Sequence, residues 1–382
     1  MPMPARRQAA EIPFGGTPSE TLPVPPFPVE TPCFVILEDA VLHNLRQTAK
    51  GAGGIERLMP HVKTHRAPWL IEAMVAEGVR AFKTATAAEV EIAAAAGAPY
   101  VVWAYPTVNA MAIARVVRVA CAHPNVRIDA LVDSVEGLRA WQTELSVASA
   151  PNLRLRLDLD PGLGRTGVAI GPGAYDLALA MQDAGLFGGW HAYDGHIQNP
   201  DRQVRIQLVS ELADRLRGFL ATARDRGLEG DLIAAGSYSF DLWPSELVRW
   251  VSPGSWTYSS SQHDVDLADV GWRIGGYVLA TVLSVREGTA TLDAGSKAIS
   301  PDIPLTDRFR GPGPIRLMKE EHVVITTDRL KIGQQVPLIP RHGCTAAYLY
   351  NRALVRLRDG RWEYRAQLGA SRSGYAPEER LG

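Results

Sequence analysis

Short apolar runs alternate with longer amphipathic stretches through the middle of the chain. After a first run at 33–37, eight more apolar runs occur at 57–62, 79–83, 99–104, 127–132, 153–159, 188–193, 231–235 and 248–251. Helix-like segments separate most of them, which is the pattern of βα units and a parallel sheet. Eight such units predict an α/β fold of the (β/α)8 barrel type. A doubly wound open sheet is the alternative, because a strand count made from one sequence can be wrong by one.

Two helix starts are marked by hydroxyl side chains. Thr86 with Glu89 three residues later forms a capping box, which predicts a helix from this point to near Gly97. Ser134, followed by Glu136, predicts another start.

The rhythm changes after about residue 270. Strand-like runs follow at 277–285, 289–292, 322–326, 335–338 and 346–357, without long helices between them. Asp359-Gly360, between the last run and 362–364, predicts a hairpin. We therefore expect an extended Pro-rich arm over 1–32, a barrel over 33–265 and an all-β domain over 266–382. The strand at 33–38 is expected to join the β domain.

Composition narrows the class of protein. The chain has 382 residues, 46% of them hydrophobic and 21% charged, which is ordinary for a globular protein. Its 40 basic and 41 acidic residues give a net charge of −1, which argues against a nucleic-acid binder. No apolar run reaches the roughly 18 residues of a membrane span, and three cysteines cannot form a disulfide framework. We expect a soluble, cytoplasmic protein.

Polar residues collect where the predicted strands end. In a (β/α)8 barrel these ends meet at one rim, where active sites lie. Any one of these residues alone is more often an ordinary loop residue, but together they predict a site. They are His61, Lys63 and His65; Tyr105; Asp133; Asp158, Asp160 and Arg165; Tyr193, Asp194 and His196; Gly236 and Ser237; Gly254 and Ser255.

Lys63 directly follows an apolar run, so we expect its amine to be partly desolvated at the rim. Burial lowers the pKa of a lysine, and a neutral amine can form a Schiff base. The alternative is an amine that simply reaches solvent. The turns at 236–237 and 253–255 follow the last two strands, where barrels often bind phosphate through backbone N–H groups. Most turns of this composition are plain turns.

His342 and Cys344 stand two residues apart, and both side chains are good zinc ligands. No second pair lies nearby in the sequence, so a closed structural zinc site is not predicted. Two protein ligands would leave positions open for water, substrate or a third residue. A His-x-Cys pair alone usually binds no metal.

Several of these segments resemble the D-threonine aldolase and D-serine dehydratase family, fold-type III pyridoxal phosphate enzymes whose barrel is related to that of alanine racemase. The resemblance covers about residues 30–355. It rests on Pro60-His61-Val62-Lys63-Thr64-His65, 82–97, 158–167, Tyr193-Asp194-Gly195-His196, 292–297, 320–322 and Pro340-x-His342-x-Cys344. The chain departs from the family at Met59, Arg66, 236–239 and 256–264, which leaves the substrate preference open.

The resemblance implies the following roles. Lys63 would hold pyridoxal 5'-phosphate as a Schiff base, with Arg165 and Tyr193 near its ring. The cofactor's phosphate would be bound by Gly236, Ser237, Gly254 and Ser255. His342 and Cys344 would bind a divalent metal, zinc or manganese, and the cysteine favours zinc. The family works as a homodimer in which the β domain of one subunit closes the barrel mouth of the other.

The leading hypothesis is a metal-assisted lyase that cleaves D-threonine-like β-hydroxy-D-amino acids to glycine and an aldehyde by a retro-aldol reaction. Lys63 and His196 are its predicted catalytic residues, with His196 as acid or base near the β-hydroxyl. The alternative is a zinc-dependent dehydratase that converts D-serine, D-threonine or 3-hydroxy-D-aspartate to a 2-oxo acid and ammonia. An amino-acid racemase and a non-catalytic carrier of the cofactor are more remote, and the metal pair argues against the carrier.

Overall fold

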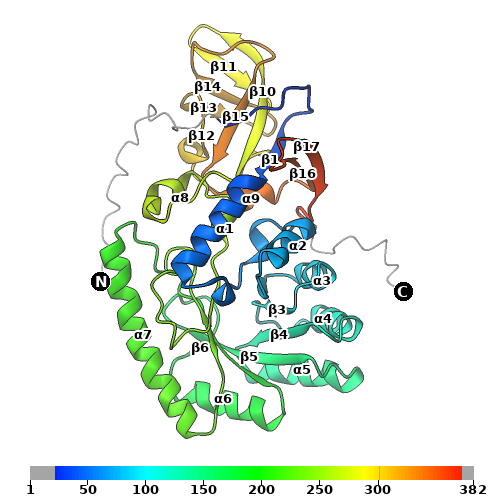
Figure 1. The fold of residues 1–382 in the computed structure, drawn as a ribbon, viewed down its shortest axis with the longest axis vertical. Coiled ribbons are helices and arrows are strands. Elements are labelled where there is room, and N and C mark those ends of the chain that lie inside the picture. Colours follow the sequence, from blue (N-terminus) through cyan, green and yellow to red (C-terminus); the bar gives the residue numbers. More distant parts are fainter. Residues whose placement is uncertain (1–21, 301, 372–382) are drawn as a thin grey trace.

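The computed structural model describes residues 22–300 and 302–371, so most of the arm predicted over 1–32 lies outside the described residues. Two domains lie one above the other (Figure 1). The lower one is built on parallel strands surrounded by helices, and the upper one on mostly antiparallel strands.

The lower domain is a barrel whose strands pair in chain order. They are β2 (Ala81–Thr84), β3 (Tyr100–Trp103), β4 (Arg127–Val132), β5 (Leu153–Asp160), β7 (Phe187–Ala192), β8 (Leu232–Ala234) and β9 (Trp250–Val251), with the short β6 (Val168–Ala169) paired only to β5. The segment 58–61 lies between β9 and β2, because Leu58 bridges Val251 and His61 bridges Lys83, both in parallel. It closes the ring, and the predicted barrel is confirmed.

Helices surround the barrel strands, and most of them follow a barrel strand in the chain (Figure 1). These are α1 (Glu38–Ala52), α2 (Pro68–Ala76), α3 (Ala87–Ala95), α4 (Ala110–Ala122), α5 (Val135–Val147), α6 (Pro172–Asp183), α7 (Arg202–Asp225) and α8 (Ser261–Asp266). Both predicted helix starts are confirmed. The Thr86 hydroxyl accepts the N–H of Glu89 at 3.2 Å, and the Ser134 hydroxyl accepts that of Gly137 at 3.1 Å.

The upper domain contains β1 (Cys33–Leu37), β10 (Gly276–Arg286), β11 (Thr289–Leu292), β12 (Phe309–Arg310), β13 (Ile315–Met318), β14 (Val323–Thr326), β15 (Gln335–Pro340), β16 (Arg352–Arg356) and β17 (Trp362–Ala366), with the helix α9 (Gly343–Ala347). β1 pairs antiparallel with β10 and parallel with β16. It therefore lies in the sheet of this domain and not in the barrel. The boundary predicted between 265 and 266 falls at the end of α8.

The predicted strand over 346–357 is wrong in its first half. That half contains the end of α9 and a turn, and β16 begins only at Arg352. Ala346 and Ala347 are fully or almost fully buried. Their small side chains let α9 pack closely against the core. The sequence pattern does not reveal this tertiary contact, which overrides the local preference for a strand. The hairpin predicted at Asp359-Gly360 is confirmed, because β16 and β17 pair across it.

The lower part of the barrel interior holds a network of buried charges. Arg156 and Asp129 are both fully buried, and their nearest nitrogen and oxygen are 2.7 Å apart. Arg156 also pairs with Asp231 at 2.6 Å, and the Tyr100 hydroxyl donates to Asp129 at 2.6 Å. Because buried charges are tolerated only when they are paired, this network fixes β3, β4, β5 and the start of β8 against one another.

Asp129→Ala should lower the free energy of unfolding by about 3 to 5 kcal/mol, because it removes the main partner of a fully buried guanidinium. Urea denaturation measures this cost. Asp214→Ala is the matched control, since Asp214 and Arg217 form an exposed pair on α7. Its cost should stay within about 0.5 kcal/mol. Equal costs for the two variants would contradict the structural role of the network.

Candidate active site

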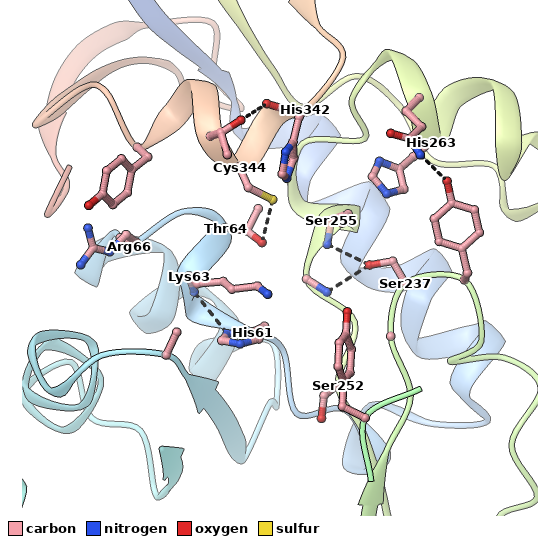
Figure 2. Close-up of a pocket in the computed structure, with 18 of the residues that line it drawn as sticks. His61, Lys63, Thr64, Arg66, Ser237, Ser252, Ser255, His263, His342 and Cys344 are labelled. Atoms are coloured by element: carbon pink, nitrogen blue, oxygen red, sulfur yellow. Dashed lines mark hydrogen bonds between the residues drawn. The ribbon is translucent and has the colours of Figure 1, made fainter. Parts of the chain in front are cut away.

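A cavity of about 570 Å³ lies at the carboxyl ends of the barrel strands, with the upper domain as its roof. Of the ten residues that were assigned a catalytic, cofactor-binding or metal-binding role, all but Arg165 and His196 line it. Six further polar residues predicted at the strand ends do not line it: His65, Tyr105, Asp133, Asp158, Asp160 and Asp194. The barrel contributes Lys63, Tyr193, Gly236, Ser237, Gly254 and Ser255, and the upper domain contributes His342 and Cys344. Figure 2 shows Lys63 between these two sides, with His342 and Cys344 above it and the Ser237–Ser255 side to the right.

Lys63 lies in a short 3-10 helix, Val62–Thr64, that starts as soon as the chain leaves the barrel wall. The Nδ1 of His61 accepts the backbone N–H of Lys63 at 3.4 Å and caps this turn. The side chain is exposed in the open cavity, and the expected partial desolvation is therefore not found in the single chain.

Lys83, at the end of the neighbouring strand β2, is the lysine that is buried. Burial, with the nearby charge of Lys63, lowers its pKa to about 7, although Asp158 acts in the opposite direction. Its Nζ lies 5.2 Å from the centre of the Tyr193 ring. The exposed guanidinium of Arg165 lies 5.0 Å from the same ring centre, so the Tyr193 ring is close to both a guanidinium and a buried amine. The sequence reasoning did not select Lys83 as a site residue.

Two turns form a cradle of backbone N–H groups beside the lysine segment. The Ser237 hydroxyl accepts the N–H of Ser255 at 3.1 Å and that of Gly254 at 3.4 Å. A Cβ on Gly254 would lie 2.9 Å from the hydroxyl oxygen of Thr64, so glycine is needed for this close approach. The buried hydroxyl of Ser252, also in the cavity wall, has no partner among the described residues. Converging N–H groups and a free hydroxyl fit the phosphate of a bound cofactor.

His342 and Cys344 stand at the start of α9 and face the same cavity. Burial acts to lower the pKa of His342, but Cys344 and Asp302 outweigh it and raise this pKa to about 9. Burial likewise tends to raise the pKa of the Cys344 thiol, but His342, Thr64 and Lys63 outweigh it and the pKa is lowered. A thiol with a lowered pKa next to an imidazole is a suitable donor pair for a soft divalent metal.

Within the described residues, no group of three or more His, Cys, Asp or Glu side chains converges on a possible metal position. The pair fits a metal that takes its other ligands from water or substrate, and catalytic metal sites keep at least one position open in this way.

The structure does not bring His196 to the cavity. Its side chain is exposed, and its ring lies next to Gly162 in the loop after β5. Gln198, two residues further on, lines the cavity instead. Proximity to a strand end does not fix the direction of a side chain in the loop that follows.

Arg66 and Glu89 also line the cavity, and the sequence reasoning did not assign them to the site. They form a fully buried ion pair with 3.0 Å between Arg66 Nε and Glu89 Oε1. The Arg66 guanidinium also donates to the carbonyl of Gly369 and lies 5.1 Å from the Tyr348 ring. The sequence signal that pointed to this pair is Glu89, which the capping-box pattern explains only as a residue at the start of α3.

Comparison with known proteins agrees with this geometry. Residues 36–262 match the N-terminal domain of alanine racemase, and residues 276–356 match the serine dehydratase domain. The chain belongs to the alanine racemase family of fold-type III pyridoxal phosphate enzymes. Its two domains together are those of the D-threonine aldolase and D-serine dehydratase group, and the resemblance predicted from sequence motifs is confirmed.

Similar solved structures cover nearly the whole described chain. D-threonine aldolase from Filomicrobium marinum is 26% identical with a TM-score of 0.80, over 88% of this chain and 95% of that one. D-threo-3-hydroxyaspartate dehydratase from Delftia sp. HT23 is 18% identical with a TM-score of 0.77, over 89% and 98%. An alanine racemase-like protein from Idiomarina loihiensis is 17% identical with a TM-score of 0.74, over 89% and 97%. No curated protein sequence matches the chain. Over the described ranges, no helix has the length and apolar character needed to cross a membrane.

Lys83→Met should change the pH dependence of stability in the cofactor-free protein. Between pH 7 and the ordinary lysine pKa of 10.5, the unfolded chain holds a proton at position 83 that the folded chain has lost. This group therefore makes the wild type more stable as the pH rises. The free energy of unfolding of the wild type minus that of the variant should increase by about 1 to 2 kcal/mol between pH 7 and pH 9. Urea denaturation at both pH values measures it, and a constant difference would contradict the buried amine.

Proposed function

We propose that this protein is a lyase dependent on pyridoxal phosphate and a divalent metal, acting on β-hydroxy-D-amino acids. The observation that carries the proposal is the set of residues that meet in the cavity at the barrel mouth. Lys63 and the N–H groups of Gly254 and Ser255 lie on its barrel side, and His342 with Cys344 lies on the facing side. The similar solved structures include an aldolase and a dehydratase, both named for hydroxylated D-amino acid substrates.

The cofactor would be attached at Lys63, whose side chain lines the cavity and is exposed there. Its phosphate would be bound by Gly236, Ser237, Gly254 and Ser255. The N–H groups of Gly254 and Ser255, which now donate to the Ser237 hydroxyl, would then donate to the phosphate. Pyridoxal phosphate supplies an electron sink for the α-carbon of the bound amino acid. Tyr193, with the Arg165 guanidinium and the Lys83 amine near its ring, would lie beside the cofactor ring.

The metal, zinc or manganese, would be held by His342 and Cys344, with the cysteine favouring zinc. A divalent metal lowers the pKa of a hydroxyl or water bound to it. Placed at the roof of the cavity, these donors would act on the β-hydroxyl end of the substrate, while Lys63 acts at the α-carbon end. The catalytic role of His196 stays a prediction, and its side chain does not line the cavity.

We infer carbon–carbon cleavage as the reaction. The Cα–Cβ bond breaks, its electron pair stays on Cα, and the β-carbon becomes the aldehyde carbonyl as its hydroxyl loses a proton. Cα then takes up a proton, which gives glycine. D-threonine would give glycine and acetaldehyde. The similarity to the Filomicrobium D-threonine aldolase supports this reaction, at higher identity than the dehydratase shows.

One observation favours dehydration as a second candidate. Variants of the D-threo-3-hydroxyaspartate dehydratase with alanine in place of a histidine and of a cysteine, two positions apart, are also similar to this chain, and the cysteine variant is described as metal-free. This is the spacing of His342 and Cys344. Lys63, once released, would take the α-proton, the β-hydroxyl would leave as water, and hydrolysis would then give a 2-oxo acid and ammonia.

We further propose a cytoplasmic homodimer in which the partner's upper domain covers the barrel mouth. The exposed apolar side chains of Tyr105, Val108 and Met111, in the segment after β3, support a covered surface there. Light scattering of the purified protein should report the mass of two chains, and the mass of one chain would contradict the homodimer.

Incubation of the enzyme, cofactor and Zn²⁺ with D-threonine should release glycine and acetaldehyde in equal amounts. L-threonine should give no product, and Lys63→Ala should abolish both turnover and the absorption of the Schiff base at the edge of the visible region. Formation of 2-oxobutanoate and ammonia instead would identify the dehydratase. If neither pair of products appears, the proposed substrate class is wrong.

His342→Ala should abolish metal-dependent turnover while the Schiff base at Lys63 is retained, because the two groups are held by different domains. Extensive dialysis against a chelator should have the same effect on the wild type, and added Zn²⁺ should restore activity to the wild type only. Unchanged turnover in His342→Ala would contradict a metal role for this pair and would favour chemistry at the cofactor alone.

A further inference from the structure

His342 makes one short contact that the proposed reaction does not use. Its Nδ1 lies 2.6 Å from Oδ2 of Asp302, a residue 40 positions earlier in the chain. An ionised carboxylate can only accept hydrogen bonds. The proton of this bond therefore belongs to Nδ1 of His342, and Nε2 is left as the nitrogen that can bind a metal.

The Asp302 carboxylate is itself held in place. Its second oxygen, Oδ1, accepts the Thr345 hydroxyl at 3.0 Å. The fully buried Ser300 hydroxyl contacts the Thr345 hydroxyl, and it donates to the His342 carbonyl at 3.2 Å. The carboxylate is thus connected through its two oxygens to both ends of the segment 342–345, which carries the two proposed metal donors.

The second donor has an outer partner from the other domain. Cys344 Sγ lies 3.4 Å from the hydroxyl oxygen of Thr64, the residue next to Lys63 (Figure 2). Each donor is therefore oriented by one further polar side chain, Asp302 for the imidazole and Thr64 for the thiol. Such outer partners fix the tautomer and direction of a ligand and contribute about 10- to 100-fold to metal affinity in other proteins.

We propose that Asp302 is a positioning residue for the metal, holding His342 with Nε2 free and aimed at the ion, and that Thr345 holds Asp302. The proposal rests on the proposed metal at His342 and Cys344. It extends that proposal to a residue that does not line the cavity. Asp302 touches neither substrate nor cofactor in this arrangement, so its effect passes through the imidazole.

The test measures metal binding rather than turnover. The full-length protein with cofactor bound is stripped of metal, and Zn²⁺ affinity is measured in competition with a chromophoric chelator for wild type, Asp302→Asn and Thr345→Val. Asp307→Asn is the matched control, because Asp307 is exposed five residues further on. Co²⁺ is added in parallel, since its thiolate absorption band reports whether Cys344 still binds the ion.

We expect Asp302→Asn to weaken Zn²⁺ binding about 10- to 100-fold, Thr345→Val to weaken it less, and Asp307→Asn to leave it unchanged. The Co²⁺–thiolate band should persist in Asp302→Asn at saturating metal, and Schiff-base absorption and circular dichroism should match the wild type.

Zinc affinity within twofold of the wild type in Asp302→Asn would overturn the proposal. Loss of cofactor absorption and of circular dichroism together with metal would also overturn it, because Asp302 would then be needed for the fold. A wild type that binds no Zn²⁺ would remove the metal from the proposed function itself, and that result is distinct from the first two.

Discussion

The Arg66 guanidinium joins the two domains, and the shape of the site depends on that junction. It is fully buried, so its charge must be matched inside the protein, and Glu89 of the barrel supplies the match. Its other N–H groups go to carbonyls of the last described segment, and its own carbonyl accepts the N–H of Leu368. Arg66 is three residues after Lys63, so its ion pair with Glu89 holds the lysine segment against the barrel. Its hydrogen bonds to the last described segment hold the upper domain above that segment.

A second constraint lies below, where the barrel encloses charged groups instead of a purely apolar core. Arg156 and Asp129 neutralise each other near the bottom, while Lys83 lies closer to the cavity with only partial compensation. Lys63 and Arg165 supply positive charge on the Tyr193 side of the cavity, and Lys83 adds to it only below about pH 7, where its amine is protonated. A doubly charged phosphate ester and a carboxylate would be drawn to such a field, and the rigid packing around it keeps the field in place.

The parts of the fold and site that follow local rules could be predicted from the sequence. The parallel strands appear as apolar runs, the Thr86 and Ser134 caps are local hydrogen bonds, and glycines after the last strands indicate close approach of the backbone. Side-chain direction and burial depend on distant partners. For that reason His196 was expected in the cavity but points elsewhere, while the buried Lys83 was overlooked.

The pairing of β1 with β10 has a consequence for synthesis of the chain. Val35 pairs in register with Tyr277, so the fully buried strand β1, which precedes the barrel in the chain, finds its partner only after the whole barrel has left the ribosome. Until then five consecutive apolar side chains have no sheet to join, and a nascent chain in this state is open to misassociation. The same arrangement makes the smaller domain discontinuous. Deleting everything after the barrel would leave β1 without the sheet that it joins, and no single cut in the chain can therefore give both domains intact.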